Sequence, residues 1–154
     1  MTTVVSGIVT RRSPYLDRYV QLGIASNRVI RVTFPTEPAA DAAEDHPLLD
    51  RIFGYLEGGT ADFSDVELAL TVPTDHRRIL EATREIPYGE GIDVATLASR
   101  IPGVTRQDEE ELQLLRTVLA ENPVPLLIPD HRVRDAPSAA PPDVEQRLRS
   151  LEGL

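Results

Sequence analysis

The chain contains no cysteine and no lysine, and it has no long hydrophobic run. Without cysteine it forms no disulfide and offers no thiolate to a metal ion or a substrate. Its apolar runs fall short of the roughly 18 to 20 residues that a membrane span needs. The first residues, 1 to 5, also lack the charged region and apolar core of a signal peptide. We therefore expect a cytoplasmic protein that does not associate with a membrane.

Acidic residues outnumber basic ones, which is the main compositional signal. There are 25 acidic residues against 16 basic ones, all of them arginine, and the formal net charge is -9. Acidic surfaces keep a protein soluble in concentrated salt, where the Debye length falls to about 3 Å at 1 M and self-repulsion is screened. This balance favours an extreme halophile as the source, and an acidic protein from a genome that prefers arginine codons is the alternative.

The first half of the chain has the pattern of a small sheet with one helix. With 154 residues, 41% of them hydrophobic, the chain can bury a core as one domain or as two small ones. Residues 3–9, 18–25 and 28–34 are rich in β-branched side chains and predict an antiparallel meander. Residues 46–56 have helical spacing, and residues 65–72 alternate like a strand. The apolar face of the expected helix consists of Leu48, Leu49, Ile52, Phe53 and Leu56.

The second half is predicted to be helical. Helices are expected over residues 74–85, 94–100, 105–120 and 143–151, separated by turns that contain proline and glycine. The fold class is therefore α+β, with a small N-terminal antiparallel sheet plus helix in residues 1–72 and a helical, winged-helix-like half in residues 73–154. The expected caps are Thr74 or Asp75 for the first of these helices, and Thr105, with Asp108 in a capping box, for the third.

Several short motifs follow one another in a fixed order along the chain. They are Ile86-Pro87-Tyr88-Gly89-Glu90, Asn122-Pro123, Ile128-Pro129, His131-Arg132-Val133 and Leu151-Glu152-Gly153. Together their order and spacing resemble the O6-alkylguanine-DNA alkyltransferases, also called methylated-DNA–protein-cysteine methyltransferases. The resemblance covers nearly the whole chain and implies a two-part alkyltransferase-like fold, a link to DNA repair, and double-stranded DNA with alkylated guanine as a partner.

One substitution in these motifs changes the expected chemistry. Asp130 stands where the family has its alkyl-accepting cysteine, while His131 and Glu152 match the family's histidine and glutamate. A carboxylate is a far poorer nucleophile toward carbon than a thiolate, so alkyl transfer to cysteine is not available. No cofactor and no metal site are expected. We expect the three residues to form a degenerate site, in which a hydrogen bond between His131 and Glu152 locks the turn and Asp130 caps the helix that follows.

Two chemical alternatives to this degenerate site stay open. Asp130 could accept an alkyl group as an ester that water then releases, which would make the protein an enzyme. The same three residues could instead hold a divalent metal ion through oxygen and imidazole ligands.

The positions that handle DNA in the family are also altered. By resemblance, Gln113, Val94, Asn122 and Arg132 stand at nucleic-acid-binding positions, with Gln113 in place of the family's base-flipping arginine and Val94 in place of a tyrosine. The glycine-rich loop that walls the family's base pocket is replaced by the shorter residues 135–142. Base extrusion requires binding energy from such a pocket, and these residues offer little of it.

The resulting function prediction is a non-enzymatic alkyltransferase-like protein that binds or senses alkylated DNA. The alternative is a repurposed scaffold that acts as a protein-interaction module without DNA binding, with a partner that the sequence does not identify. Acidic residues 108–111, at the start of the expected recognition helix, favour the alternative because they would repel phosphates. The same acids also stabilise a helix N-terminus.

Overall fold

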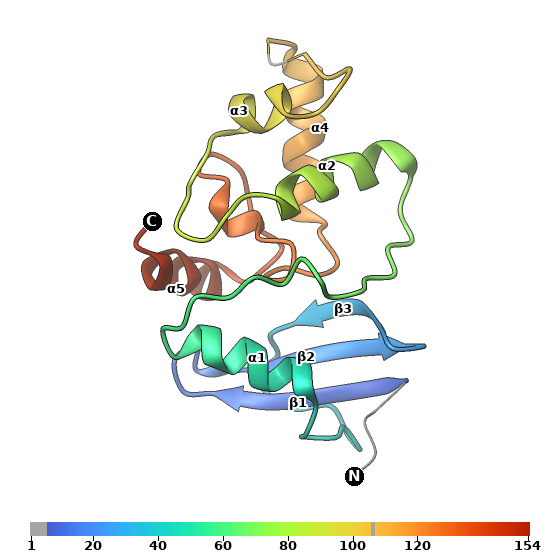
Figure 1. Ribbon diagram of the computed structural model, residues 1–154, viewed down its shortest axis with the longest axis vertical. Helices are drawn as coiled ribbons and strands as arrows, with labels where there is room; N and C mark the ends of the chain where they lie inside the picture. The colour runs from blue at the N-terminus through green and yellow to red at the C-terminus, as the bar shows by residue number, and fades with distance from the viewer. Residues whose placement is uncertain (1–5, 106) are drawn as a thin grey trace.

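An antiparallel sheet of three strands, in the order β1-β2-β3, forms one end of the molecule, and a helix lies across one face of it (Figure 1). The computed structural model describes residues 6–105 and 107–154. The strands and helices in chain order are β1 Gly7–Ser13, β2 Arg18–Ala25, β3 Arg28–Thr33, α1 Pro47–Leu56, α2 Thr74–Arg84, α3 Val94–Ser99, α4 Glu109–Ala120, a 3-10 turn Asp130–Arg132, and α5 Pro142–Glu152.

The α+β fold class predicted from the sequence is confirmed. Along β2 the side chains of Val20, Leu22 and Ile24 are buried while those between them are half-buried, as expected for a strand with one face in the core. The predicted helix α1 packs its apolar face on this sheet. His46 caps α1, because its Nδ1 accepts a hydrogen bond from the Leu48 backbone amide at 3.1 Å.

Two strand predictions were wrong in position or type. The first strand is described over Gly7–Ser13 rather than residues 3–9, of which residues 3 to 5 lie outside the described residues. It extends further because Ser13 still pairs with Arg18 across the hairpin. Residues 65–72 do not form a strand: they make one isolated bridge, between Val29 and Leu68, because only two backbone hydrogen bonds join them to β3.

The predicted helices of the second half are present: α2 and α3 start at the predicted residues, α5 starts one residue earlier, and α4 starts four residues later. The cap of α2 is Pro73, without a side-chain hydrogen bond, so Thr74 is the first helical residue rather than the cap. The start of α4 is later than expected because Asp108, not Thr105, accepts the hydrogen bonds of its first turn; residue 106 lies outside the described residues. Within the described parts of the chain, no helix is long and apolar enough to cross a membrane.

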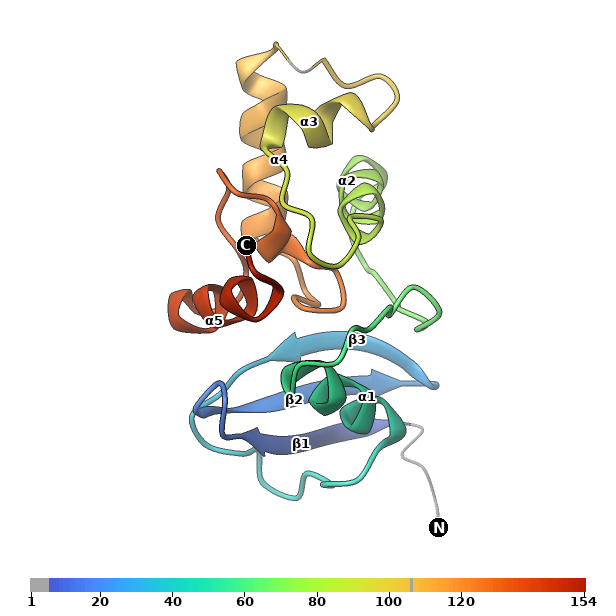
Figure 2. The same cartoon turned by 60° about the vertical axis from the view of Figure 1, so that its left-hand side comes forward.

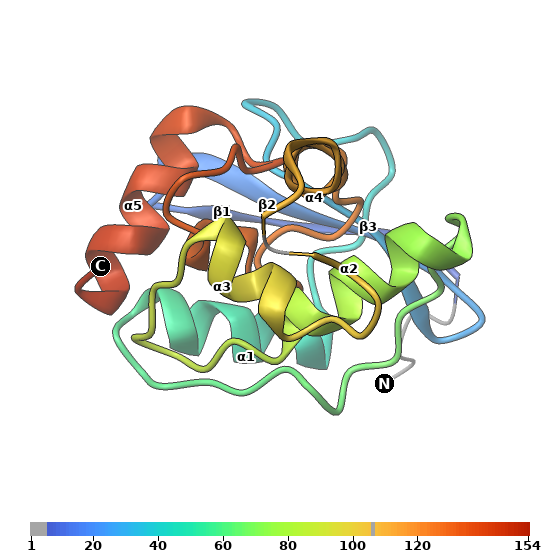
Figure 3. The same ribbon diagram turned by 90° about the horizontal axis from the view of Figure 1, so that it is seen from above.

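The helices α2, α3 and α4 gather at the end of the molecule opposite the sheet (Figure 2), and α4 is nearly end-on when seen from above (Figure 3). One hydrophobic cluster contains residues of both halves. Polar contacts also join them: Val32 N donates to the Pro123 carbonyl at 2.9 Å, and Arg18 pairs with Asp143 at 3.0 Å. Two predictions are not tested by these contacts: the boundary between residues 72 and 73, and the likeness of the second half to a winged helix.

Candidate functional site

The loop that leads from α4 to the 3-10 turn is built around Asn122. Its three prolines, at positions 123, 125 and 129, prevent a helix from continuing. The buried Asn122 side chain ties the loop together, since its Nδ2 donates to the Ile128 carbonyl at 3.0 Å and its Oδ1 accepts from the Val124 amide at 3.0 Å. The loop therefore delivers Asp130 to a fixed place in the interior.

Asp130 is almost completely buried, with 1% of its surface exposed. Its Oδ2 accepts hydrogen bonds from Asn122 Nδ2 at 3.1 Å and from the Ala139 amide at 2.9 Å. Its Oδ1 accepts a hydrogen bond from the Ser138 hydroxyl at 2.5 Å. Asp130 does not cap the turn that it begins, which corrects the expectation from the sequence. Both of its oxygens are instead engaged by neutral groups.

This environment favours the neutral form of the Asp130 carboxyl. Burial raises its pKa because the charged form loses its contact with water, and the hydrogen bonds from Ser138, Ala139 and Asn122 only partly oppose the rise. None of the three hydrogen-bond donors is charged. A carboxyl group held in this way is suited to anchoring its neighbours rather than to attacking a substrate.

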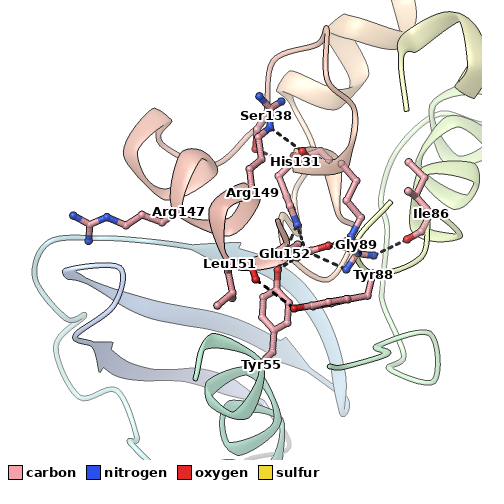
Figure 4. A network of polar contacts seen from close by, with 12 residues as sticks. Tyr55, Ile86, Tyr88, Gly89, His131, Ser138, Arg147, Arg149, Leu151 and Glu152 are labelled. Atoms are coloured by element: carbon pink, nitrogen blue, oxygen red, sulfur yellow. Dashed lines mark hydrogen bonds and ion pairs between the residues drawn. The ribbon is translucent and has the colours of Figure 1, made fainter. Parts of the chain in front are cut away.

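Glu152, at the end of α5, is the second buried carboxylate of the site and the centre of a larger network (Figure 4). It accepts hydrogen bonds from Tyr55 Oη at 2.5 Å, from Arg132 Nε at 2.8 Å and from the Gly89 amide at 2.9 Å. His131 Nε2 lies 2.5 Å from its Oε2. The network therefore joins α1, the turn before α3, the 3-10 turn and α5.

Unlike Asp130, Glu152 has a positively charged neighbour, the guanidinium of Arg132. Burial alone would raise the pKa of Glu152, but the hydrogen bonds from His131 and Arg132 outweigh this effect and lower its pKa to about 2. Burial, together with the hydrogen bond to Glu152, raises the pKa of the Tyr55 hydroxyl, which therefore stays protonated as a donor.

His131 is held on two sides. Its Nε2 faces Glu152, and its carbonyl oxygen accepts a hydrogen bond from Arg149 Nε at 2.9 Å. Its buried Nδ1 has no hydrogen-bond partner among the described residues. The predicted hydrogen bond between His131 and Glu152 is therefore present, in a geometry that fixes the turn.

The structure brings only one of the four predicted nucleic-acid-binding residues to the surface. Gln113 is exposed on α4. In contrast, Val94 and Asn122 are buried, and Arg132 is 9% exposed and paired with Glu152. A direct contact with DNA is therefore open to Gln113, while the other three positions could act only by shaping the structure around it.

The surface near Gln113 is acidic. Residues 108–110, at the start of α4, are exposed carboxylates. Arg116, one turn along α4 from Gln113, lies 4.0 Å from the Asp135 carboxylate and donates from its Nε to the Asp135 carbonyl oxygen at 3.3 Å. Its positive charge is therefore partly offset by a neighbouring acid.

A cavity of about 900 Å³ lies between the linker after α1, the end of α2 and the loop before the 3-10 turn. Phe63, Arg84, Tyr88 and Arg132 are among its lining residues, and Asp130 is not. The cavity therefore reaches Pro129 and Arg132, on either side of Asp130 in the chain, but the Asp130 side chain does not open into it. Among residues 6–105 and 107–154, no group of three His, Asp or Glu side chains is placed to share a metal ion.

Sequence reasoning missed two members of the site. Tyr55 was not among the residues expected on the buried face of α1, although it lies three residues after Ile52 and so on the same face. Ser138 was treated as part of a featureless loop. Its hydroxyl had no local pattern that could reveal a contact with Asp130, eight residues earlier.

The chain has relatives among proteins of known name, although no model of a protein family matches it. A methylated-DNA–protein-cysteine methyltransferase of Methanopyrus kandleri is 33% identical over 111 residues, which cover 68% of this chain and 77% of that protein. A protein of the same name from Metallosphaera sedula is 27% identical over 86 residues, covering 56% of this chain and about half, 51%, of that relative.

Solved structures show the same fold. The O6-methylguanine methyltransferase of Mycobacterium tuberculosis superimposes with a TM-score of 0.72 at 22% identity, covering 95% of this chain and 90% of that one. A structure of the Mycobacterium tuberculosis OGT in complex with DNA has a TM-score of 0.72 at 23% identity, with 96% and 91% covered. The methyltransferase of Pyrococcus kodakaraensis has a TM-score of 0.69 at 16% identity, with 96% and 100% covered. The fold is therefore that of the alkyltransferases.

Proposed function

Because the chain belongs to the methylated-DNA–protein-cysteine methyltransferase family, we propose that it is a non-enzymatic member that binds alkylated DNA without taking up the alkyl group. The burial and hydrogen bonding of Asp130 are the main evidence that the protein does not take up an alkyl group. The residue replaces the sulfur nucleophile, is 1% exposed, and has both oxygens engaged in hydrogen bonds. No cysteine elsewhere in the chain could replace it.

The same observation argues against an enzyme that uses Asp130 as an ester-forming acceptor. A carboxyl nucleophile must approach the substrate carbon with a free lone pair and in the charged form. Burial favours the neutral form by raising the pKa of Asp130, and Ser138 and Ala139 cover its two oxygens. Attack would require the charged form and displacement of the donor that covers the attacking oxygen, which is Ser138 for Oδ1 and Ala139 for Oδ2.

Two observations support DNA binding: the similarity to DNA methyltransferases in sequence and fold, and the exposed side chain of Gln113. The related methyltransferases are named for methylated DNA, and a Mycobacterium tuberculosis protein of the same fold has been solved with DNA. Gln113 stands on α4 at the position where the family carries its base-flipping arginine, and its side chain is exposed. An uncharged Gln113 could fill a gap in the base stack, but it would not attract phosphates.

A second candidate function is a protein-interaction module, and the charge of α4 favours it. Exposed acids at residues 108–110 would repel the phosphates of a duplex, and Arg116 is already paired with Asp135. In concentrated salt the repulsion is screened, because the Debye length falls to about 3 Å at 1 M. The two functions therefore predict different responses to salt.

The experiment that tests the proposal is binding of a labelled duplex carrying one O6-methylguanine, compared with the same duplex carrying guanine, at low and at multimolar salt. The proposed function predicts preferential binding of the methylated duplex at high salt. The substitution Gln113→Ala should weaken binding of the methylated duplex at least about fivefold, as expected for the loss of one base contact. The control Gln146→Ala changes an exposed glutamine on α5 and should leave binding unchanged. Absence of binding to either duplex at both salts would favour the interaction module.

A further inference from the structure

Residues 134–140, between the 3-10 turn and α5, form a strap over the site that is attached at both ends. At its first end, Asp135 Oδ1 accepts a hydrogen bond from the Val94 amide at 2.7 Å. The Arg134 amide donates to the Ile92 carbonyl at 2.8 Å in the same place. At its second end, Ser138 and Ala139 donate to Asp130. The strap therefore runs from the start of α3 to the buried carboxyl.

The second end is organised by a single hydroxyl. Ser138 Oγ donates to Asp130 Oδ1 at 2.5 Å and accepts from the Ala140 amide at 3.0 Å. Ala140 is 5% exposed, so this turn places apolar surface of the strap against the core. Removing the hydroxyl would release both of its hydrogen bonds, while the attachment at Asp135 and Arg134 would stay.

The strap supplies two of the three hydrogen bonds to Asp130, and the third comes from Asn122 on the inner side. Asn122 is itself held by Ile128 and Val124, so it belongs to the rigid loop rather than to the strap. Asp130 therefore lies between the inner loop that holds Asn122 and an outer segment whose hydrogen bonds to it, within residues 6–105 and 107–154, come from Ser138 and Ala139. Both of these bonds come from neutral donors, and such a hydrogen bond is weak enough for a ligand to break.

From this arrangement we propose that the strap is a lid that closes the site at Asp130 in the free protein. The lid opens from its Ser138 end, and a DNA base reaches the site only after the hydrogen bond between Ser138 and Asp130 breaks. This inference rests on the proposed binding of alkylated DNA. Asp130 is in this account a positioning residue, because it acts through the strap and not on a substrate.

The lid is tested first in the free protein by amide hydrogen exchange of wild type and Ser138→Ala. The amides of Ala139 and Ala140 should exchange roughly 5- to 30-fold faster in the variant, as expected for loss of about 1 to 2 kcal/mol. The Arg134 amide should keep its protection, because its bond to Ile92 lies at the hinge. The control Ser150→Ala removes a hydroxyl from an exposed position on α5 and should change neither.

A second variant, Asp130→Ala, distinguishes loss of the hydrogen bond between Ser138 and Asp130 from a general loosening of residues 134–140. In Asp130→Ala the same two amides should exchange faster. Adding Ser138→Ala to it should produce less than the sum of the two effects, because both changes remove the same hydrogen bond between Ser138 and Asp130. Equal exchange of Ala139 and Ala140 in wild type and Ser138→Ala would overturn the lid.

The gating role is then tested by binding of the methylated and the unmethylated duplex to the same proteins. Ser138→Ala should bind the methylated duplex more tightly, by about the factor found in exchange, with little change for the unmethylated one. Faster exchange with equal binding of the methylated duplex by both proteins would overturn the lid but leave the proposed function in place. Faster exchange with no binding of either duplex by either protein would overturn the proposed function, and with it the gating of a base.

Discussion

The site contains two buried carboxyl groups, Asp130 and Glu152, and their surroundings differ in charge. Glu152 lies against the guanidinium of Arg132 and the imidazole of His131, and its pKa is lowered to about 2. Asp130 is held by a hydroxyl and two amide groups, and burial raises its pKa. The difference shows that one buried carboxylate has a cationic partner, Arg132, while the hydrogen bonds to the other come from neutral donors.

The largest expected effect is that of Glu152→Gln. The substitution leaves the Arg132 guanidinium buried without a counter-charge, so the free energy of unfolding should fall by about 3 to 5 kcal/mol. Chemical denaturation at neutral pH measures it. Glu145→Gln is the matched control on the same helix, because its ion pair with Arg149 is partly exposed and contributes less than about 1 kcal/mol. Equal losses in the two variants would contradict the assignment of Glu152 as the centre of the network.

The free energy of unfolding should also depend on pH, because the charge of Glu152 stabilises the folded chain. The pKa of Glu152 is lower in the folded chain, about 2, than its ordinary value of 4.5. Its contribution is therefore fully present above about pH 4.5 and is lost as the pH falls toward 2, by about 3 kcal/mol in total. The difference in unfolding free energy between wild type and Glu152→Gln should shrink over this range. A difference that stays constant down to pH 2 would show that the charge of Glu152 is not what stabilises the fold.

A smaller effect is expected from Tyr55→Phe. The change removes the hydroxyl that donates to Glu152 Oε2 at 2.5 Å and leaves the packing of the ring, so the loss should be about 1.5 to 3 kcal/mol. Tyr19→Phe is the control, at a half-buried position of β2. A loss below about 0.5 kcal/mol, no larger than a typical surface substitution, would exclude this hydroxyl as a significant link between α1 and the site.

The smallest effect is expected from Asp130→Asn. The amide can accept from Asn122 and Ala139 and can donate to the Ser138 hydroxyl, and it removes a charge that burial disfavours. At neutral pH the variant should be as stable as wild type or more stable by up to about 1 kcal/mol. Because the pKa of Asp130 is raised in the fold, this advantage should decrease as the pH falls and the wild-type carboxyl becomes neutral. Strong destabilisation by Asp130→Asn would mean that its charge is needed.

Local patterns were sufficient for most of the fold. The alternation along residues 18–25 and the helical spacing of residues 46–56 depend on one buried face each, and both elements are present. Residues 65–72 alternate in the same way but form no strand, because alternation reports which side chains are buried and not whether the backbone pairs. The start of α4 depended on which of several acidic or hydroxyl side chains captures the first amides, a choice between nearly equal caps.

The sequence predicted one contact of the site, between His131 and Glu152, but not the contacts made by Ser138 and Tyr55. The pairing of His131 with Glu152 followed from a resemblance in motif order, and the structure contains it. The contacts of Asp130 with Ser138 and of Glu152 with Tyr55 depend on how a loop and a distant helix pack, and the second pair is 97 residues apart in the chain. No periodicity in the sequence encodes such contacts, so they emerged only from the folded arrangement.

The central claim is that replacing sulfur by the anchored Asp130 carboxyl has ended alkyl transfer. It is tested most directly by the mass of the intact wild-type protein after incubation with an excess of duplex carrying O6-methylguanine, with a cysteine-bearing relative as the positive control. The account predicts that the relative gains one methyl group while this protein keeps its mass and the DNA keeps its lesion. A methyl group on this protein, located at Asp130 by fragmentation, or loss of the methyl group from the DNA would contradict it.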